Sequence, residues 1–134
     1  QLQNLGKTNI SFSPSIVGAS NLVYAPNTVF RVALLTKYVG EQYMGNIDAD
    51  LSKLDSYLTN DINISYVLTP NSWIKEAQFS LLVNNIFNEL YTSNGYFYTY
   101  DDDFSDPNVI TTIEGVGYYP QAGTNFLLGA TFRF

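Results

Sequence analysis

Hydrophobic and polar residues alternate along five segments of the chain. In the segment 28–40, Phe30 and Val32 fall on one parity, whereas Arg31 and Lys37 fall on the other. Successive side chains of a β-strand point to opposite sides, so a period of two indicates strands with one apolar and uncharged face. The pattern predicts strands near residues 11–24, 28–40, 57–69, 77–88 and 121–134.

The connections between these segments alternate in length. Turn residues predict short connections at 25–27 and 70–76, whereas the connections at 41–56 and 89–120 are long. Long loops are uncommon in compact soluble domains, but short turns on one side and long loops on the other are typical of bacterial outer-membrane barrels. The predicted strands also reach the roughly 9–11 residues that cross a bilayer at a tilt. We therefore expect an all-β fold, a transmembrane antiparallel β-barrel segment.

Composition narrows the classes of function. Only 13% of the 134 residues are charged, about half the share in an average soluble domain, and 46% are hydrophobic. The absence of His and Cys excludes imidazole and thiol chemistry, and we expect neither an enzyme nor a cofactor. A net charge of −6 argues against nucleic acid as a partner, because phosphate binding requires clustered Lys and Arg. All acidic residues except Asp61 and Glu76 lie in the two long connections.

Two other architectures remain open on this pattern. A soluble β-sandwich binding module would bury the apolar parity between two sheets, and its isolated chain would be a monomer in water. A small, complete outer-membrane barrel would expose the same parity to lipid. Strand length, loop asymmetry and the uncharged parity favour the membrane over the sandwich.

The end of the chain carries a further signal. Gly129, Phe132 and Phe134 form a spacing that resembles the barrel-assembly signal of outer-membrane proteins, with Leu127 where that signal usually has a polar residue. A final strand of this kind is expected to place two aromatic side chains on the lipid face. Trp73, in the predicted turn at 70–76, is expected to act as an interface anchor.

The chain resembles the C-terminal end of TonB-dependent outer-membrane receptors, in the form common in Bacteroidetes. The resemblance spans nearly the whole chain from about residue 11, and its most specific part is the closing stretch. The segments that carry it are Ser13-Pro14-Ser15-Ile16, Lys37 to Tyr43, Leu54 to Tyr57 with Asp61 to Tyr66, Val83 to Asn88 with Tyr91, and Tyr119 to Gly123 through Phe134.

This resemblance implies a 22-stranded barrel plugged by an N-terminal domain, in an outer-membrane transporter that takes up a scarce nutrient. Iron chelates such as ferric siderophores, cobalamin and glycans are all open as cargo. The implied partners are outer-membrane lipid, the remaining barrel and plug, the TonB complex through an N-terminal box, and the barrel-assembly machinery. We expect this chain to supply about the last five strands, without the plug domain, because five strands leave two open edges that lipid does not tolerate. The C-terminus is expected in the periplasm, and 41–56 and 89–120 outside the cell.

The aromatic run in the second long connection is the best candidate for ligand binding. Exposed aromatic patches commonly mark binding surfaces, although packing against other loops would explain the run equally well. The candidate residues are Tyr96, Phe97, Tyr98 and Tyr100.

Charged residues give weaker candidates. Arg31 and Lys37 are expected to face the lumen, where they either steer an anionic substrate or are simply solvated. Asp101, Asp102, Asp103 and Asp106 are best interpreted as a solvated acidic loop. The alternative is a Ca²⁺ site, although the run lacks the glycine and downstream Glu of an EF-hand.

Overall fold

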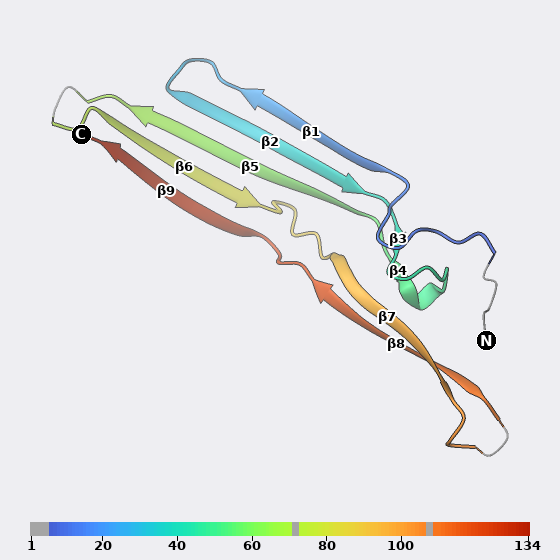
Figure 1. Cartoon of the computed structure of the whole chain (residues 1–134). Helices are drawn as coiled ribbons and strands as arrows, with labels where there is room; N and C mark the ends of the chain where they lie inside the picture. Colours follow the sequence, from blue (N-terminus) through green and yellow to red (C-terminus); the bar gives the residue numbers. More distant parts are fainter. Residues whose placement is uncertain (1–5, 71–72, 107–108) are drawn as a thin grey trace. The chain divides into compact units, whose positions relative to one another are not determined.

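The computed structural model describes residues 6–70, 73–106 and 109–134, which fold into antiparallel β-sheets (Figure 1). The chain consists of two compact units, which we name the sheet unit and the hairpin unit. The sheet unit comprises Val17–Val39, Tyr57–Leu90 and Ala122–Phe134, and the hairpin unit comprises Gln1–Ile16, Gly40–Ser56 and Tyr91–Gln121. Along the described ranges, no helix has the length and hydropathy required to cross a bilayer.

The sheet unit is a single antiparallel sheet of five strands. Across the sheet the order is β1, β2, β5, β6 and β9. Strands that follow one another in the sequence of this unit therefore also pair in the sheet. The strands are β1 (Val17–Tyr24), β2 (Phe30–Val39), β5 (Tyr57–Leu68), β6 (Glu76–Asn84) and β9 (Asn125–Arg133). The prediction of an all-β, antiparallel fold is confirmed. Within the described residues the sheet is open, because β1 and β9 each pair on one side only.

The register brings most of the large apolar side chains of the five strands to one side of the sheet. Leu81 of β6, for example, pairs with Ile64 of β5 and with Leu128 of β9. Directly paired residues of antiparallel strands point to the same side, so such rows build a continuous surface. This surface, the apolar face, contains Leu22, Tyr24, Phe30, Val32, Leu34, Ile62, Ile64, Tyr66, Leu68, Ala77, Phe79, Leu81, Val83, Phe126, Leu128, Ala130 and Phe132.

The opposite side, the polar face, carries every charged residue of the five strands. They are Arg31, Lys37, Asp61, Glu76 and Arg133. Serine, threonine and asparagine occupy many of the positions between them, although Leu82 and Leu127 also lie on this side. The two sides of one thin sheet are therefore suited to different environments.

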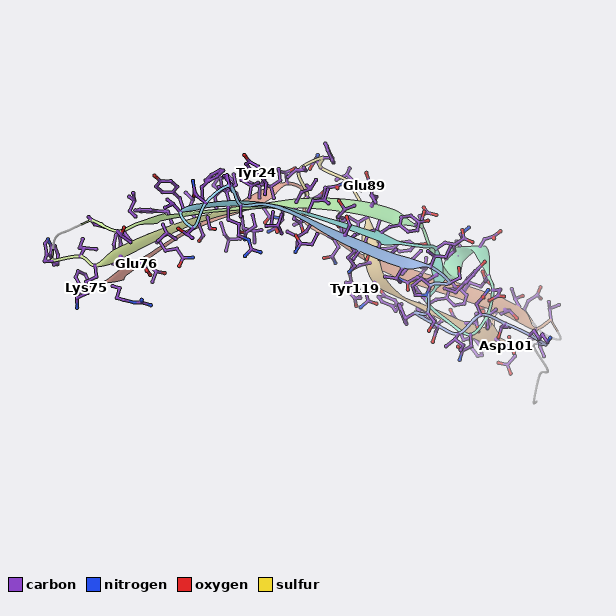
Figure 2. All side chains as sticks on the ribbon, turned by 90° about the horizontal axis from the view of Figure 1, so that it is seen from above. Tyr24, Lys75, Glu76, Glu89, Asp101 and Tyr119 are labelled. Atoms are coloured by element: carbon purple, nitrogen blue, oxygen red, sulfur yellow. The ribbon has the colours of Figure 1, made fainter. Side chains whose placement is uncertain are left out.

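No second layer covers either face among the described residues of the sheet unit. On the apolar face Leu22, Phe126 and Leu128 are 66%, 70% and 76% exposed. Figure 2 shows side chains projecting from both sides of the sheet. Buried apolar residues in the described part of the chain are Ala33, Val39, Met44, Leu54, Tyr57 and Ala77. Within the described part of the sheet unit, the buried apolar residues are Ala33, Val39, Tyr57 and Ala77.

The first strand is shorter than the predicted 11–24 and begins only at Val17. Phe12 has a positive φ of 52°, which breaks extended backbone, and its N–H donates to the Tyr43 carbonyl at 2.8 Å. Pro14 has no N–H to donate to a ladder. These residues belong to the hairpin unit.

The predicted strand at 77–88 ends at Asn84, because the next residue leaves extended backbone. Asn85 has a positive φ of 51°, a conformation that asparagine tolerates better than most residues. The predicted strand at 121–134 likewise starts only after Thr124, whose hydroxyl donates a 2.7 Å hydrogen bond to the Asn85 carbonyl.

The hairpin unit occupies the two segments that we expected to be loops. In 89–120, β7 (Thr92–Asp102) and β8 (Thr111–Pro120) pair as a long antiparallel hairpin. In 41–56, β3 (Gln42–Tyr43) and β4 (Lys53–Leu54) pair around a short 3₁₀ turn, Asp50–Ser52. These long connections between strands of the sheet unit thus contain strands of their own, because tyrosine, phenylalanine and threonine favour strands even where no single parity is apolar.

Candidate functional site

The β7–β8 hairpin gathers three of the predicted ligand-binding residues on one side. Tyr96, Tyr98 and Tyr100 alternate along β7, and we call them the tyrosine ladder. Their ring centroids are 6.3 Å and 6.4 Å apart, with an angle of 14° between successive ring planes. Each residue is about half exposed. Tyr119 of β8 extends this surface, since its ring centroid lies 6.2 Å from that of Tyr96.

Glycines on β8 explain how the rings lie. Gly117 pairs with Tyr96, and Gly115 pairs with Tyr98. The far end of each tyrosine ring extends over its paired glycine, into the space that a Cβ at the glycine would fill. An aromatic ring that covers a cross-strand glycine buries exposed backbone and is held in place by it. Tyr96 and Tyr98 therefore rest on the backbone of β8, and Tyr100 continues the row beside Ile113.

Phe97, the fourth predicted residue, does not join the ladder. It belongs to the opposite parity of β7 and points to the other side of the hairpin. A Cβ added to Gly45 would lie 3.5 Å from the Phe97 Cδ1 atom, so Phe97 packs against the 41–56 segment. On the same side, the Tyr118 hydroxyl donates to the Leu51 carbonyl at 3.3 Å. Phe97 is a packing residue of the hairpin unit.

The acidic residues at the hairpin tip form local turns. Asp102 Oδ1 accepts hydrogen bonds from the backbone N–H groups of Phe104 and Ser105, at 3.0 Å and 3.1 Å. A hydrogen bond from the Ser105 side chain, together with these backbone donors, lowers the pKa of Asp102. Asp101 Oδ1 accepts a 2.8 Å bond from the Thr112 hydroxyl.

The same residues were the alternative candidates for a Ca²⁺ site. In the described part of the chain, no three acidic side chains converge on a position where they would hold a metal ion. Asp101 and Asp102 are neighbours on β7 and so point to opposite sides of the hairpin. At the hairpin tip, Asp101, Asp103 and Asp106 are exposed and Asp102 is partly exposed.

Arg31 and Lys37 lie on the polar face of the sheet unit, as their parity predicted. Arg31 pairs in register with Ser65, and Lys37 pairs with Thr59. The two residues are six positions apart on β2, about 20 Å along an extended strand. They do not form one cationic site.

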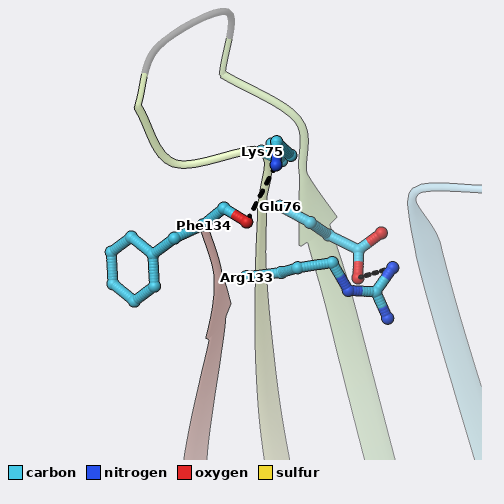
Figure 3. A network of polar contacts seen from close by, with 4 residues as sticks. All are labelled: Lys75, Glu76, Arg133 and Phe134. Atoms are coloured by element: carbon cyan, nitrogen blue, oxygen red, sulfur yellow. Dashed lines mark hydrogen bonds and ion pairs between the residues drawn. The ribbon is translucent and has the colours of Figure 1, made fainter.

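The last residues of the chain are held by the turn between β5 and β6 (Figure 3). Lys75 donates to the main-chain oxygen of Phe134 from Nζ at 3.0 Å, and its backbone N–H donates to the Arg133 carbonyl at 2.8 Å. Trp73 stacks on Phe134, with ring centroids 5.0 Å apart. The exposed ion pair of Arg133 with Glu76, at 3.8 Å, contributes little to stability on its own.

The predicted assembly-signal residues fall on both faces of β9. Phe132 lies on the apolar face, where its ring meets Phe79 edge to face at 6.1 Å. Gly129 lies on the polar face and pairs with Ser80, whose Oγ would be 2.6 Å from a Cβ at this glycine. Gly129 thus leaves room for Ser80 beside it.

Sequence reasoning missed Tyr119, Gly115 and Gly117 as parts of the tyrosine surface. Their only sequence signal is the alternation of glycine along residues 115–117, next to a tyrosine pair at 118–119. The pairing register of β7 with β8 is needed to assign them to the ladder.

Comparisons of this chain with protein-family models, with curated proteins and with solved structures found no match.

Proposed function

We propose that this chain forms part of the wall of an outer-membrane β-barrel, in a TonB-dependent receptor that takes up a scarce nutrient. The remaining barrel strands, a plug domain and an N-terminal TonB box would be supplied outside residues 1–134. The chain would act as a transporter component and not as an enzyme.

The division of charge between the two sides of the sheet carries this proposal. The apolar face has no charged residue along any of the five described strands, whereas the polar face has all of them. Barrel strands in lipid alternate in this way, with apolar residues outward and polar residues toward the lumen. A charge on the lipid side of such a barrel costs about 2–4 kcal/mol at the bilayer midplane.

The connections support the same arrangement. Antiparallel order places the short β1–β2 and β5–β6 connections at one end of the sheet. The long connections after β2 and β6 leave from the other end. In an outer-membrane barrel the short turns are periplasmic and the long loops extracellular. In this orientation the tyrosine ladder would lie outside the cell and the C-terminus in the periplasm.

The open edges of the sheet support a larger barrel rather than a small, complete one. β1 and β9 leave backbone N–H and C=O groups unpaired at both edges of the described sheet. In hydrocarbon such groups have no water to bind, so spanning sheets close. Further strands would pair with β1 and β9, as in a 22-stranded barrel.

The soluble β-sandwich is less well supported. A sandwich requires a second sheet over the apolar face, and Leu22, Phe126 and Leu128 on that face are mostly exposed. Exposed apolar surface of this extent would drive association in water.

Fractionation of cells that produce the natural protein tests the proposal. We expect the protein in the outer-membrane fraction, extracted only by detergent and heat-modifiable on gels. Recovery of the protein from the water-soluble fraction as a stable monomer would contradict the membrane assignment.

A further inference from the structure

The hairpin unit carries an aromatic surface that the proposed function leaves without a ligand. Tyr96, Tyr98, Tyr100 and Tyr119 are 50%, 52%, 52% and 54% exposed. Tyrosine is enriched where proteins bind other proteins, because it combines a large rigid ring with a polar tip. Tyr96 and Tyr98 lie over Gly117 and Gly115, and this packing reduces the conformational entropy that these two rings lose on binding.

The hairpin unit carries an excess of negative charge, with nine acidic residues against Lys7 and Lys53. The segment 77–132 contains neither Lys nor Arg. Its acidic residues are Glu89, Asp101, Asp102, Asp103, Asp106 and Glu114. Asp102 shares the ladder's parity on β7, whereas Asp101 and Glu114 point to the other side of the hairpin. A ligand that approaches the ladder therefore meets aromatic rings within a negative field.

Both features favour cationic side chains. Lys and Arg are attracted to the faces of aromatic rings, by about 0.5–1 kcal/mol each at exposed sites, and a surrounding negative potential steers them there. A neutral ligand would use the rings but gain nothing from the carboxylates, and an anionic ligand would be repelled.

The spacing of the rings specifies the form of the ligand. Successive centroids are 6.3 Å and 6.4 Å apart. In an extended peptide, side chains on the same side recur every two residues, about 6.6 Å apart. We propose that the tyrosine ladder binds an extended segment of a partner protein that carries Arg or Lys at every second residue, one cation to each ring. This inference goes beyond the proposed function and stands whether or not the sheet faces lipid.

Composition-matched peptides test the spacing. The probes are Arg-Thr-Arg-Thr-Arg and Arg-Arg-Arg-Thr-Thr, labelled with a fluorophore and titrated against the natural protein in mild detergent. We expect the alternating peptide to bind about two- to fivefold more tightly, because the blocked peptide can place only two cations on the ladder side. Equal affinities would show that binding depends on the total charge of the peptide and not on the spacing of its Arg residues, and this result would overturn the proposal.

Substitutions at the ladder test the rings. Tyr98→Leu should weaken binding of the alternating peptide about two- to fivefold, whereas Tyr98→Phe keeps the ring and should bind nearly as the natural protein does. Tyr118→Leu on the opposite side of the hairpin is the control for general loss of structure and should leave the affinity unchanged. An unaffected Tyr98→Leu variant, or binding of a neutral oligosaccharide in place of the peptides, would contradict the assignment.

Discussion

At the scale of single residues, the turn after β6 depends on Asn85. Its backbone N–H donates to Asp61 Oδ1 at 2.7 Å, and its side-chain Nδ2 donates to the Glu89 carbonyl at 2.8 Å. Its Oδ1 accepts from the Glu89 N–H at 2.9 Å. The residue is 5% exposed, and its φ is 51°. One buried side chain thus satisfies several backbone groups in a conformation that few residues adopt.

Substitutions at Asn85 should separate these two contributions. Asn85→Gly keeps the positive φ but loses the side-chain hydrogen bonds, and we expect a loss of about 1–3 kcal/mol in the free energy of unfolding. Asn85→Ala should lose about 1 kcal/mol more, because alanine disfavours this backbone conformation. Urea unfolding of the natural protein and both variants, followed by circular dichroism, measures the three free energies of unfolding and so ranks their stabilities. An alanine variant as stable as the natural protein would show that the network contributes nothing.

At the scale of elements, the glycines of the sheets differ in what surrounds them. A Cβ at Gly95 would lie 2.5 Å from the Gly117 carbonyl oxygen, which is fixed backbone. A Cβ at Gly115 would meet only the far end of the Tyr98 ring, which can swing away. A Cβ at Gly18 of β1 would have no neighbour within 4 Å.

Alanine at these three positions should therefore have graded effects. Gly95→Ala should destabilise the hairpin by about 1–3 kcal/mol, in the range found for overpacking. Gly115→Ala should destabilise the hairpin less than Gly95→Ala does, because the Tyr98 ring can be displaced. Gly18→Ala should leave the stability unchanged or raise it slightly. Limited chymotrypsin digestion of the 92–120 segment measures the effect. If Gly18→Ala exposed that segment as much as Gly95→Ala, the contacts of Gly95 would not be the cause.

Alternation predicted β2, β5, β6 and β9 because each has a largely apolar and uncharged parity, whereas β1 alternates less clearly, since Gly18 and Ser20 share the parity of Leu22. The hairpin at 92–120 could not be predicted this way, since both of its sides use aromatic residues. Phe97 packs against the 41–56 segment, whereas Tyr96 and Tyr98 lie over glycines of β8. Strand ends were missed where Phe12 and Asn85 take positive φ values, which no periodicity encodes.

The candidate site was predictable only in part, for a related reason. Tyr96, Tyr98 and Tyr100 share a parity, so their common side follows from any strand assignment. Tyr119 joins them through the pairing register of β7 with β8, which includes a bulge between Thr92 and Asn94. The pairing register between two distant segments depends on tertiary structure, so it cannot be predicted from the sequence of either segment alone.

At the scale of the whole molecule, the two sides of the five-stranded sheet suit different surroundings. The five strands pair so that charge is confined to the polar face, and no described residue of the sheet unit covers the apolar face. A sheet of this kind is stable when lipid covers one side and water or a lumen element covers the other.

Leu81 and Leu82 test this claim most directly, because they are the same residue at adjacent positions of β6. Leu81 lies on the apolar face between Ile64 and Leu128, whereas Leu82 lies on the polar face between Asn63 and Leu127. The measurement is the yield of folded, heat-modifiable protein in outer membranes for Leu81→Lys and Leu82→Lys. We predict a severe loss for Leu81→Lys, from a cost of about 2–4 kcal/mol in lipid, and a yield near that of the natural protein for Leu82→Lys. Equal yields, or a greater loss for Leu82→Lys, would contradict the assignment of the apolar face to lipid.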